Sequence, residues 1–584
     1  MLGTYASFLV ILAACVLVGQ AILVACGRPG WSWLAPATGL AALCALAWWT
    51  VRLPGEGTAA LITIAIAAAA SALYLRGRVA TGNGALEWGI WVGLAALVLA
   101  SLPFVVEGRF GILGTGLNPD MSQHLFAADR LASGGSERLI AEGYPLGPHA
   151  IVVAVSALGP TTVQAFDGLT LAVAVAACLA PLALLDLVGG WKRFSAALWI
   201  GFAYLVAAYL VQGAFKETMQ ALFLLALAIG LLCLAGRRPV AGDRGTPDLL
   251  AAAPLAVLAV GSVYTYSFPG LAWLVGAVAV WALVELVRAV GEGAQSAARD
   301  LLRRAAPPAL VAIAVLAVAT LPEASRLVDF AGFETFDPDG EGLGNLFDRL
   351  SPLEALGIWP SGDFRLEPGD GAVPAIVFYL GAALGAAALG FGLRWWWRRG
   401  ERAVPAALAA AVVLWLYSLV AGTPYQEAKA LVLAAPLVAL VSARALVAGA
   451  PALIAAAILL AAGGSSLLAL VNGPVGPSGY SPALAELRER LGDRSVTVVA
   501  PAELLDEQHG RDYLTWELRG NRICIQADDD MAEPEGSTVL RVELDDGAVV
   551  PVAVDRNAGA ALPAEEPCPL IPDGARADPS AAGG

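Results

Sequence analysis

The sequence predicts an α-helical, polytopic membrane protein with a small α/β domain at its C-terminal end. Of its 584 residues, 58% are hydrophobic and only 14% are charged, whereas soluble domains carry about a quarter charged residues. Apolar runs repeatedly reach about 18 to 22 residues, the length that crosses about 30 Å of hydrocarbon. After residue 471 these runs stop, and shorter segments with alternating apolar and polar residues follow.

About fourteen apolar runs are long enough to be expected as membrane spans. They cover residues 5–26, 32–51, 57–75, 86–106, 163–187, 195–212, 216–235, 249–266, 270–288, 305–322, 373–393, 403–420, 428–446 and 450–471. No basic segment precedes the first run and no clear cleavage site follows it, so we expect a retained helix and not a signal peptide.

Basic residues in short loops predict the orientation of these spans. They fall on one side of the membrane at Arg28, Arg76, Arg78, Lys192, Arg193, Arg237, Arg238, Arg303, Arg304 and the run "RWWWRRGER" at 394–402. The positive-inside rule makes that side cytoplasmic. Both termini and the C-terminal domain are then extracytoplasmic, and Arg52 is the one loop charge that disagrees.

The C-terminal part, residues 472–570, is expected to form the separate α/β domain. Strands are predicted at 495–500, 521–527, 537–544 and 547–554, with helices at 481–492 and 501–518. Residues 571–584 are rich in Pro, Ala and Gly and are expected to be disordered. The first 471 residues form the predicted membrane domain.

Charge and cysteine usage narrow the function classes. From Gly479 onward there are 21 acidic and 9 basic residues, so −12 of the net charge of −14 lies there, which argues against a nucleic-acid partner. Five of the seven cysteines lie in apolar runs. Cys524 and Cys568 lie in the polar part and can pair if that part is outside the cell.

The densest polar cluster of the membrane domain is the stretch "NPDMSQHLFAADR", which begins at Asn118. It predicts a short helix after Pro119, on which Asp120 and His124 share a face because they are four residues apart. The following stretch "EGYPLGPHAIVVAVSALG" places Tyr144 and His149 before an apolar segment that is too short to span. We expect this segment to lie on the outer leaflet or to dip into it.

Lysine and histidine are rare in the chain, and their positions are not scattered. Two of the three lysines, Lys216 and Lys429, lie at extracytoplasmic helix ends beside Glu217 and Glu427, and two of the three histidines lie in the 107–162 segment. Ionisable residues at membrane depth usually mark a function. The pattern therefore predicts one extracytoplasmic site built from distant loops.

Structural readings of the same residues remain open at this point. Asp120 also suits a helix N-cap or a solvated loop acid, and the Lys–Glu neighbours also suit ion pairs that anchor helix ends. Tyrosines at positions 264, 266 and 425 also suit an interfacial aromatic belt.

The Asp loop, "YPLGPH", "FKE" and "YQEAK", in this order, resemble the GT-C superfamily of integral-membrane glycosyltransferases, over about residues 1–470. The resemblance implies a GT-C-like fold and a polyprenyl-phosphate sugar as donor. It implies inverting transfer to an extracytoplasmic acceptor, which is a cell-wall or envelope glycan, a lipid or a protein.

The resemblance also implies roles for individual residues. Asp120 would be the general base that deprotonates the acceptor hydroxyl, and His124 would orient the acceptor or steady Asp120. The negative charge of the leaving phosphate would be stabilised by Arg130, Lys216 or Lys429. The alternative is a divalent cation, Mg or Mn, held near Asp120 or Asp129. The other substrate-binding candidates are Tyr144, His149, Glu217, Tyr264, Tyr425, Gln426 and Glu427.

Three other functions remain open from the sequence. A transporter or flippase for a lipid-linked glycan would bind its cargo near the midplane. A polysaccharide ligase or polymerase would use arginines of the large loop 323–372, namely Arg326, Arg349 and Arg365. A non-catalytic assembly protein would bind a glycan or a partner through its C-terminal domain.

Overall fold

The computed structural model describes most of the chain up to Asp555. The described part omits residues 80–84, 116, 119, 134–139, 141, 186–187, 236–248, 292–294, 333–341, 477–483, 485–486, 489–490, 492–494, 502–513, 515, 520, 528–537, 546–547 and 556–584. Cys568, most of the two predicted C-terminal helices and the predicted disordered tail lie outside it.

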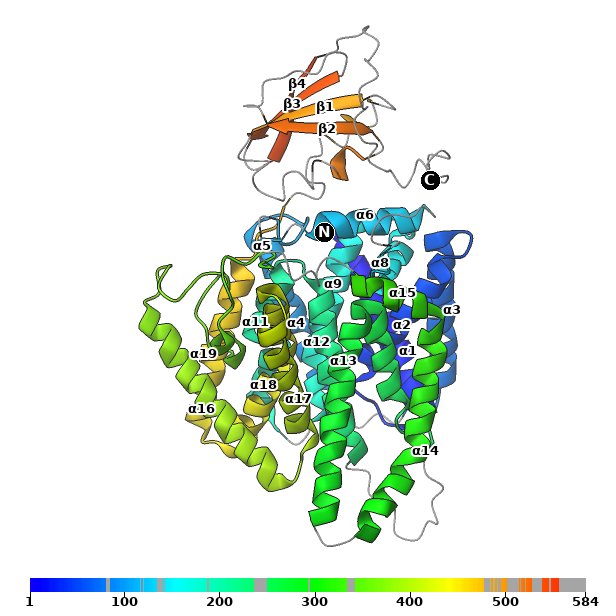
Figure 1. Ribbon diagram of the computed structural model, residues 1–584, viewed down its shortest axis with the longest axis vertical. Coiled ribbons are helices and arrows are strands. Elements are labelled where there is room, and N and C mark those ends of the chain that lie inside the picture. The colour runs from blue at the N-terminus through cyan, green and yellow to red at the C-terminus, as the bar shows by residue number, and fades with distance from the viewer. Residues whose placement is uncertain are drawn as a thin grey trace.

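Long apolar helices form the body of the protein (Figure 1). Within the described residues, ten helices are long and apolar enough to cross a membrane, or up to eleven if the bent pair α10 and α11 forms one span. The ten are α1 (Leu2–Ala25), α3 (Glu56–Leu75), α9 (Thr162–Leu179), α12 (Phe215–Ala235), α13 (Ala253–Gly291), α14 (Gln295–Thr320), α16 (Ala375–Arg399), α17 (Ala403–Ala421), α18 (Pro424–Gly449) and α19 (Ala452–Val471). The chain is therefore a helical, multi-pass membrane protein.

The remaining predicted spans correspond to shorter or interrupted helices. Two are short, α2 (Ala35–Val51) and α4 (Ala85–Ala100). One is broken: α10 (Gly190–Gly201) and α11 (Tyr204–Val211) meet at an angle of 55°. The predicted runs 249–266 and 270–288 correspond to the two arms of α13 (Ala253–Gly291). The predicted total of about fourteen spans stays a prediction.

Helix α13 is not straight, because the chain turns sharply at Ser267, whose φ of 56° and ψ of −152° are not helical. Gln220 of α12 bonds to both sides of the turn: its Oε1 accepts from Ser262 Oγ at 2.7 Å, and its Nε2 donates to Gly270 O at 3.0 Å. In a straight helix, eight residues would separate Ser262 from Gly270 by about 12 Å. The two arms of α13 are thus joined by a tight turn that precedes Pro269.

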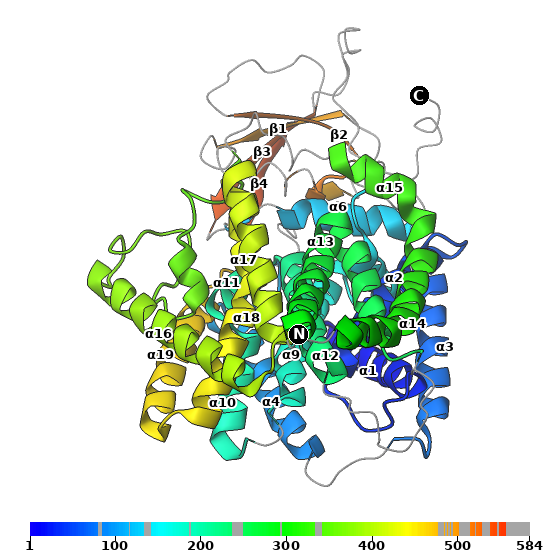
Figure 2. The same ribbon diagram turned by 60° about the horizontal axis from the view of Figure 1, so that its bottom comes forward.

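Several short helices gather at one end of the body, beneath the β-sheet. They are α5 (Leu102–Val106), α6 (Asp120–Ala132), α8 (Gly147–Ser156), α15 (Ala324–Asp329) and the 3₁₀ segments η2 (Leu321–Glu323) and η3 (Phe330–Gly332). A further 3₁₀ segment, η5 (Pro352–Leu356), packs against α11, α16 and α18. Figures 1 and 2 both show α6 between the sheet and the long helices. We call this end the sheet end. The apolar part of α8 is buried inside the protein, and is not exposed on its surface.

The opposite end, which we call the basic end, carries basic residues of the described short loops; Arg237 and Arg238 lie outside the described residues. Here Lys192 Nζ donates to Val447 O at 3.3 Å, and Arg444 forms an ion pair with Glu401. The guanidinium of Arg399 lies 4.7 Å from the ring centroid of Trp395. The 3₁₀ segment η1 (Ala180–Ala183) follows α9 directly. Arg52 lies at the sheet end instead, where it bonds to Glu323 at 2.9 Å.

The C-terminal part contains a four-stranded sheet in the order β2-β1-β3-β4. Its strands are β1 (Ser495–Ala500), β2 (Arg522–Ala527), β3 (Thr538–Asp545) and β4 (Ala548–Asp555), where the sequence predicts strands. β1 pairs in parallel with β2 and β3, in registers that align Val498 with Ile525 and Leu540, and β4 is antiparallel to β3. Parallel pairs need crossover connections, as an α/β domain has.

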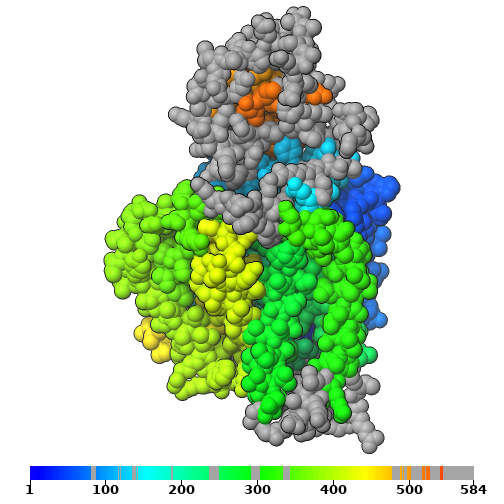
Figure 3. All heavy atoms as spheres, in the orientation of Figure 1, coloured from blue at the N-terminus to red at the C-terminus, as the bar shows by residue number. Residues whose placement is uncertain are grey.

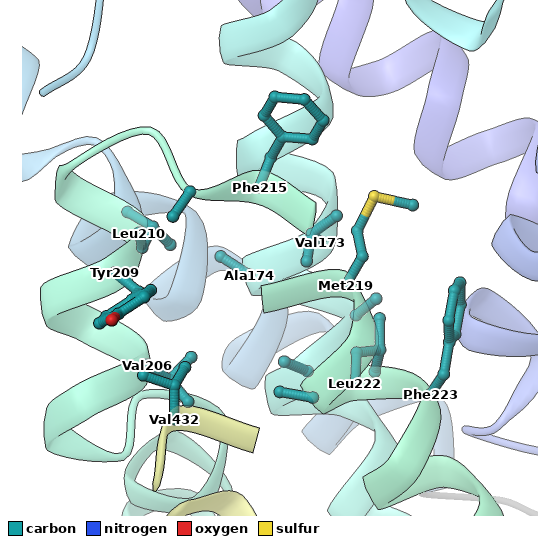
Figure 4. Close-up of a cluster of buried hydrophobic side chains, with 14 of the residues drawn as sticks. Val173, Ala174, Val206, Tyr209, Leu210, Phe215, Met219, Leu222, Phe223 and Val432 are labelled. Carbon is teal, nitrogen blue, oxygen red and sulfur yellow. The ribbon is translucent and has the colours of Figure 1, made fainter. Parts of the chain in front are cut away.

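The apolar core lies between helices from both halves of the chain. In Figure 4, Val173 of α9, Leu210 of α11, Met219 and Phe223 of α12 and Val432 of α18 converge in one buried cluster. Other helices lie outside this core: Figure 3 shows α13 and α14 in green beside α17 in yellow on one face. Large apolar side chains on α14 and α16 are exposed there, as expected for surfaces that face lipid.

Candidate active site

Four helices begin close together at the sheet end, and each brings polar side chains in its first turns. They are α6, α8, α12 and α18, which start at Asp120, Gly147, Phe215 and Pro424. Helix N-termini present unpaired N–H groups and the positive end of the helix dipole. The backbones of the four helix starts alone therefore create a region that favours negative charge.

Helix α6 supplies Asp120. The backbone N–H of Asp120 donates to Asn118 Oδ1 at 3.0 Å, so Asn118 caps the helix and Asp120 lies in its first turn. The Asp120 side chain is half-buried, and its Oδ2 accepts from the Tyr425 hydroxyl at 3.3 Å. The Asp120 carboxylate therefore reaches solvent and is oriented by a residue 305 positions away.

The start of α12 is held against α6 by a glycine turn. Gly213 has a φ of 75°, in the left-handed region. A Cβ on Gly213 would lie 2.9 Å from Met121 Cγ and 3.0 Å from Leu113 O. This close approach requires glycine, and it places Lys216 and Glu217 next to α6.

The side chain of Lys216 is nearly buried, with only 7% of its surface exposed. Its Nζ lies 3.5 Å from the ring centroid of Tyr144. Within the described residues, Lys216 forms no salt bridge or hydrogen bond, and its Nζ is not among the fully buried unpartnered atoms. The Lys216 amine is therefore narrowly exposed to solvent, and the Tyr144 ring is the cation–π partner that the described residues give it.

Glu217 is paired, in contrast to its neighbour. Its Oε1 lies 3.0 Å from Lys429 Nζ and accepts from the Tyr266 hydroxyl at 3.4 Å. Lys429 Nζ also lies 4.0 Å from the ring centroid of Tyr425. This network joins α12, the turn of α13 and α18. The sequence also suited an interfacial aromatic belt for Tyr266, but its hydroxyl contacts Glu217 in this network.

His124 and His149 form a buried pair, with His149 Nε2 3.2 Å from His124 Nδ1. Phe215 packs edge-on against both rings, at centroid distances of 4.9 Å and 5.6 Å. Burial lowers the pKa of both histidines well below the usual value; the pKa of His124 is lowered further by His149, Lys216 and Lys429. Both rings are therefore neutral near pH 7.

Tyr144 connects this pair with the charged groups. Burial raises the pKa of Tyr144, and the negative charge of Asp120 raises it further, so the hydroxyl stays protonated. Arg326 Nη2 donates to the Tyr144 carbonyl oxygen at 2.8 Å and is paired with Glu323 at 3.3 Å. Arg326 therefore fixes the segment that carries the Tyr144 ring beneath Lys216.

Helix α18 brings Tyr425 and Lys429 through a strong N-terminal cap. Thr423 and Gln426 form a reciprocal capping box, so the Gln426 side chain serves the helix start. Gly344 has a φ of 60°, and a Cβ there would lie 2.7 Å from the Tyr425 ring. Glu427 is buried and bonds to Arg349 Nη1 at 2.8 Å, on the other side of the helix start from Lys429.

Three other predicted site residues have different surroundings. Tyr264 donates to Ala319 O at 2.5 Å and accepts from Trp49 Nε1 at 2.7 Å, so it joins α2 to α14. Asp129 Oδ2 lies 3.4 Å from Arg519 Nε of the C-terminal part. Arg130 is half-buried at the far end of α6. Within the described residues, no three His, Cys, Asp or Glu side chains lie close enough together to hold a metal ion.

The cluster as a whole consists of buried groups behind a half-exposed rim. We call it the sheet-end cluster; the buried members are His124, His149, Lys216 and Glu217, and the half-exposed members are Asp120, Tyr144, Tyr266, Tyr425 and Lys429. It offers the two carboxylates of Asp120 and Glu217, two lysine amines, neutral imidazoles and phenol hydroxyls. Such a set can bind an anion and accept a proton from a neighbouring hydroxyl.

The chain matches no known protein family, no curated protein and no solved structure.

Proposed function

We propose that this protein is a membrane glycosyltransferase of the GT-C type. It would transfer a sugar from a polyprenyl-phosphate donor to an acceptor hydroxyl at the sheet end. The observation that carries the proposal is the meeting of Asp120 with Lys216 and Lys429, from three separate helix starts, in the sheet-end cluster. A base beside cations at a membrane end suits a lipid-borne phosphate and a water-borne acceptor.

In this proposal Asp120 is the general base. Its Oδ2 removes the proton from the acceptor hydroxyl, and the oxygen attacks the anomeric carbon of the donor sugar. The bond from that carbon to the phosphate oxygen breaks, and inversion results. The Tyr425 hydroxyl, 3.3 Å from Oδ2, holds the carboxylate in one orientation, as a base within hydrogen-bond reach of its proton requires.

The leaving phosphate gains negative charge, and Lys216 is placed to meet it. Lys429 already has Glu217 at 3.0 Å as its partner, whereas Lys216 has no acid within salt-bridge distance in the described chain. The N-termini of four helices add their dipoles. Fixed positive groups of this kind stabilise a transition state without reorganisation.

Two features support an extracytoplasmic sheet end. Described basic loop residues such as Lys192 and Arg399 lie at the opposite end, as the positive-inside rule expects of the cytoplasmic side. Cys524 is disulfide-bonded, and disulfides persist in oxidising compartments. The donor, a lipid-linked sugar displayed outside, and an envelope acceptor would meet there.

The other functions fit the site less well. All three arginines of a ligase-type loop are engaged with acids: Arg326 with Glu323, Arg349 with Glu427 and Arg365 with Asp363. A transporter would gather its polar groups at the midplane, whereas the sheet-end cluster lies at helix starts.

A transfer assay on purified protein with a panel of polyprenyl-phosphate sugars tests the proposal. We expect Asp120→Asn to lower the rate by about 100-fold or more, because removing a positioned base costs about 10²–10⁴-fold. Asp329→Asn is the matched control: Asp329 is an exposed acid at the end of α15, and its change should leave the rate unaltered. Full transfer by Asp120→Asn would remove Asp120 from the base role.

A further inference from the structure

The contact between the two buried histidines restricts which of their ring nitrogens carry hydrogens. A neutral imidazole carries one N–H donor and one acceptor nitrogen. Since His149 Nε2 lies 3.2 Å from His124 Nδ1, one of these two nitrogens must carry the hydrogen and the other must not. The two arrangements give His124 opposite properties at its remaining nitrogen, Nε2.

The remaining nitrogen of His149 decides between them. His149 is 0% exposed, and its Nδ1 has no hydrogen-bond partner among the described residues. Its surroundings are the rings of Phe166 and Phe215, each with its centroid 5.6 Å from that of His149. Among backbone groups, a buried N–H without a partner is rarer than a buried acceptor without one, and we apply the same preference to the ring nitrogens. The hydrogen of His149 therefore belongs on Nε2.

The consequence passes to His124. If His149 Nε2–H donates, His124 Nδ1 accepts, and the hydrogen of His124 is on Nε2. This nitrogen forms no hydrogen bond within the described chain and is not one of the fully buried side-chain atoms, so it reaches solvent. His124 also lies near Lys216, because the Tyr144 ring has its centroid 6.1 Å from that of His124 and 3.5 Å from Lys216 Nζ.

We propose that His149 is a positioning residue that locks His124 in the Nε2–H tautomer, so that His124 presents a neutral N–H donor to an anionic oxygen held beside Lys216. His124 is then neither a proton shuttle nor a base in this site. The tautomer follows from the chain alone; the identity of the oxygen, a phosphate oxygen of the lipid donor, rests on the proposed function.

The first experiment needs no substrate. The chain has three histidines, so a ¹⁵N-histidine-labelled sample in nanodiscs gives few signals, which His124→Gln and His149→Gln variants assign. At pH 7 we expect both His124 and His149 to show a protonated Nε2 and an unprotonated Nδ1. A protonated Nδ1 on His124, or an imidazolium form of either ring, would overturn the inference.

A second experiment compares substitutions at His149. A glutamine amide can take the place of Nε2 and still donate to His124, whereas phenylalanine keeps the ring and removes the donor. In the His149→Phe protein we expect the His124 signals to divide between both tautomers, and in His149→Gln to stay with Nε2–H. A single unchanged His124 tautomer in His149→Phe would show that His149 does not set it.

The transfer rate should follow the same order. We expect His149→Phe to lower it by about 10- to 100-fold, the effect of losing one hydrogen bond at a buried site, and His149→Gln to stay within about threefold of the wild type. Equal losses in the two variants would assign His149 a packing role only. Addition of polyprenyl phosphate without sugar should shift the His124 Nε2 signal. No shift with this probe would refute the phosphate contact and leave the Asp120 test of the function independent.

Discussion

At the scale of single residues, the two lysines of the sheet-end cluster have opposite relations to stability. Lys429 is paired with a buried acid, whereas Lys216 is nearly buried against the Tyr144 ring and has no ion-pair partner among the described residues. Burying a charge without a hydrogen-bonded partner costs stability. We therefore interpret Lys216 as a residue kept for binding and Lys429 as one that also supports the fold.

Substituting each lysine by methionine separates the two roles. In detergent, the Lys216→Met protein should melt at a temperature equal to or higher than that of the wild type. Its transfer rate should fall by about 100-fold. Lys429→Met should be destabilised by about 3–5 kcal/mol, because Glu217 is left buried without its partner. Thermal melting and the transfer assay measure both; a large destabilisation by Lys216→Met would contradict this assignment.

The histidine pair makes stability depend on pH with a definite sign. The pKa of His124 and of His149 is lowered in the folded protein, while the unfolded chain has the usual value near 6.5. Below about pH 6.5 the unfolded state binds more protons than the folded state, so stability falls as the pH falls. The slope is about 1.4 kcal/mol per pH unit for each such histidine.

Melting curves between pH 5 and 8 check this expectation. The His149→Phe protein is the comparison, since it lacks one of the two buried imidazoles and should show a shallower decline below about pH 6.5. A wild-type stability that is flat over this range, or that rises toward acid pH, would contradict the prediction.

The sequence predicts the members of the cluster better than their contacts. The scarcity of lysine and histidine points to Lys216, Lys429, His124 and His149, because such residues are costly near a membrane and persist for a reason. Spacing within one helix says nothing about partners in another. For this reason only the tertiary structure shows that Tyr266, and not the predicted Tyr264, contacts the cluster. The same holds for the pairing of Glu427 with Arg349.

At the scale of secondary-structure elements, the turn of α13 is the most strained feature of the site. The backbone of Ser267, with φ 56° and ψ −152°, lies in a region that only glycine adopts readily. The Gln220 bonds on both sides of the turn hold it in place. The strained turn positions Tyr266 so that its hydroxyl can donate to Glu217 of the cluster.

Ser267→Gly should therefore stabilise the protein by about 1 kcal/mol, since it relieves strain of about 1–3 kcal/mol and adds the flexibility of glycine. Ser267→Ala is the matched control, because it removes the same hydroxyl and keeps the strain. Thermal melting of the two variants side by side is the measurement. A destabilised Ser267→Gly protein would show that the turn needs the serine side chain.

Helix α6 and the α13 turn differ in how readily they follow from local sequence. Pro119 and the polar pattern after it predict a helix where α6 is found, and "YTYSFPG" predicts a break near Pro269. The division of one predicted span into α10 and α11 has no comparable local signal, since it depends on packing against α18 and α19.

At the scale of the whole molecule, the C-terminal part is connected to the site through α6. Leu113, ahead of α6, forms a bridge with Val475, just after α19, and Gly114 N donates to Pro474 O at 3.0 Å. Farther along, Asp129 lies 3.4 Å from Arg519. Helix α6, which carries Asp120 and His124, is thus held at both ends. The segment after α19 contacts the residues ahead of α6, and Arg519, which follows β1, contacts its last turn.

A double-mutant cycle with Asp129→Asn and Arg519→Gln measures the second connection. Both side chains are partly exposed, 24% and 13%, so we expect a coupling of about 0.2–1 kcal/mol in melting experiments. The transfer rate should change by less than about threefold, because the pair lies away from Asp120. A coupling above about 2 kcal/mol would mean that this contact is a major support of α6.

The rarity of lysine gives the protein a built-in chemical probe. Besides the N-terminal amine, the chain has three primary amines that an acylating reagent can modify, and two of them, Lys216 and Lys429, lie in the sheet-end cluster. Mass spectrometry of peptides acetylated with and without a candidate lipid would therefore report occupancy directly. Ligands can be screened by shielding of two amines, before any reaction product is known.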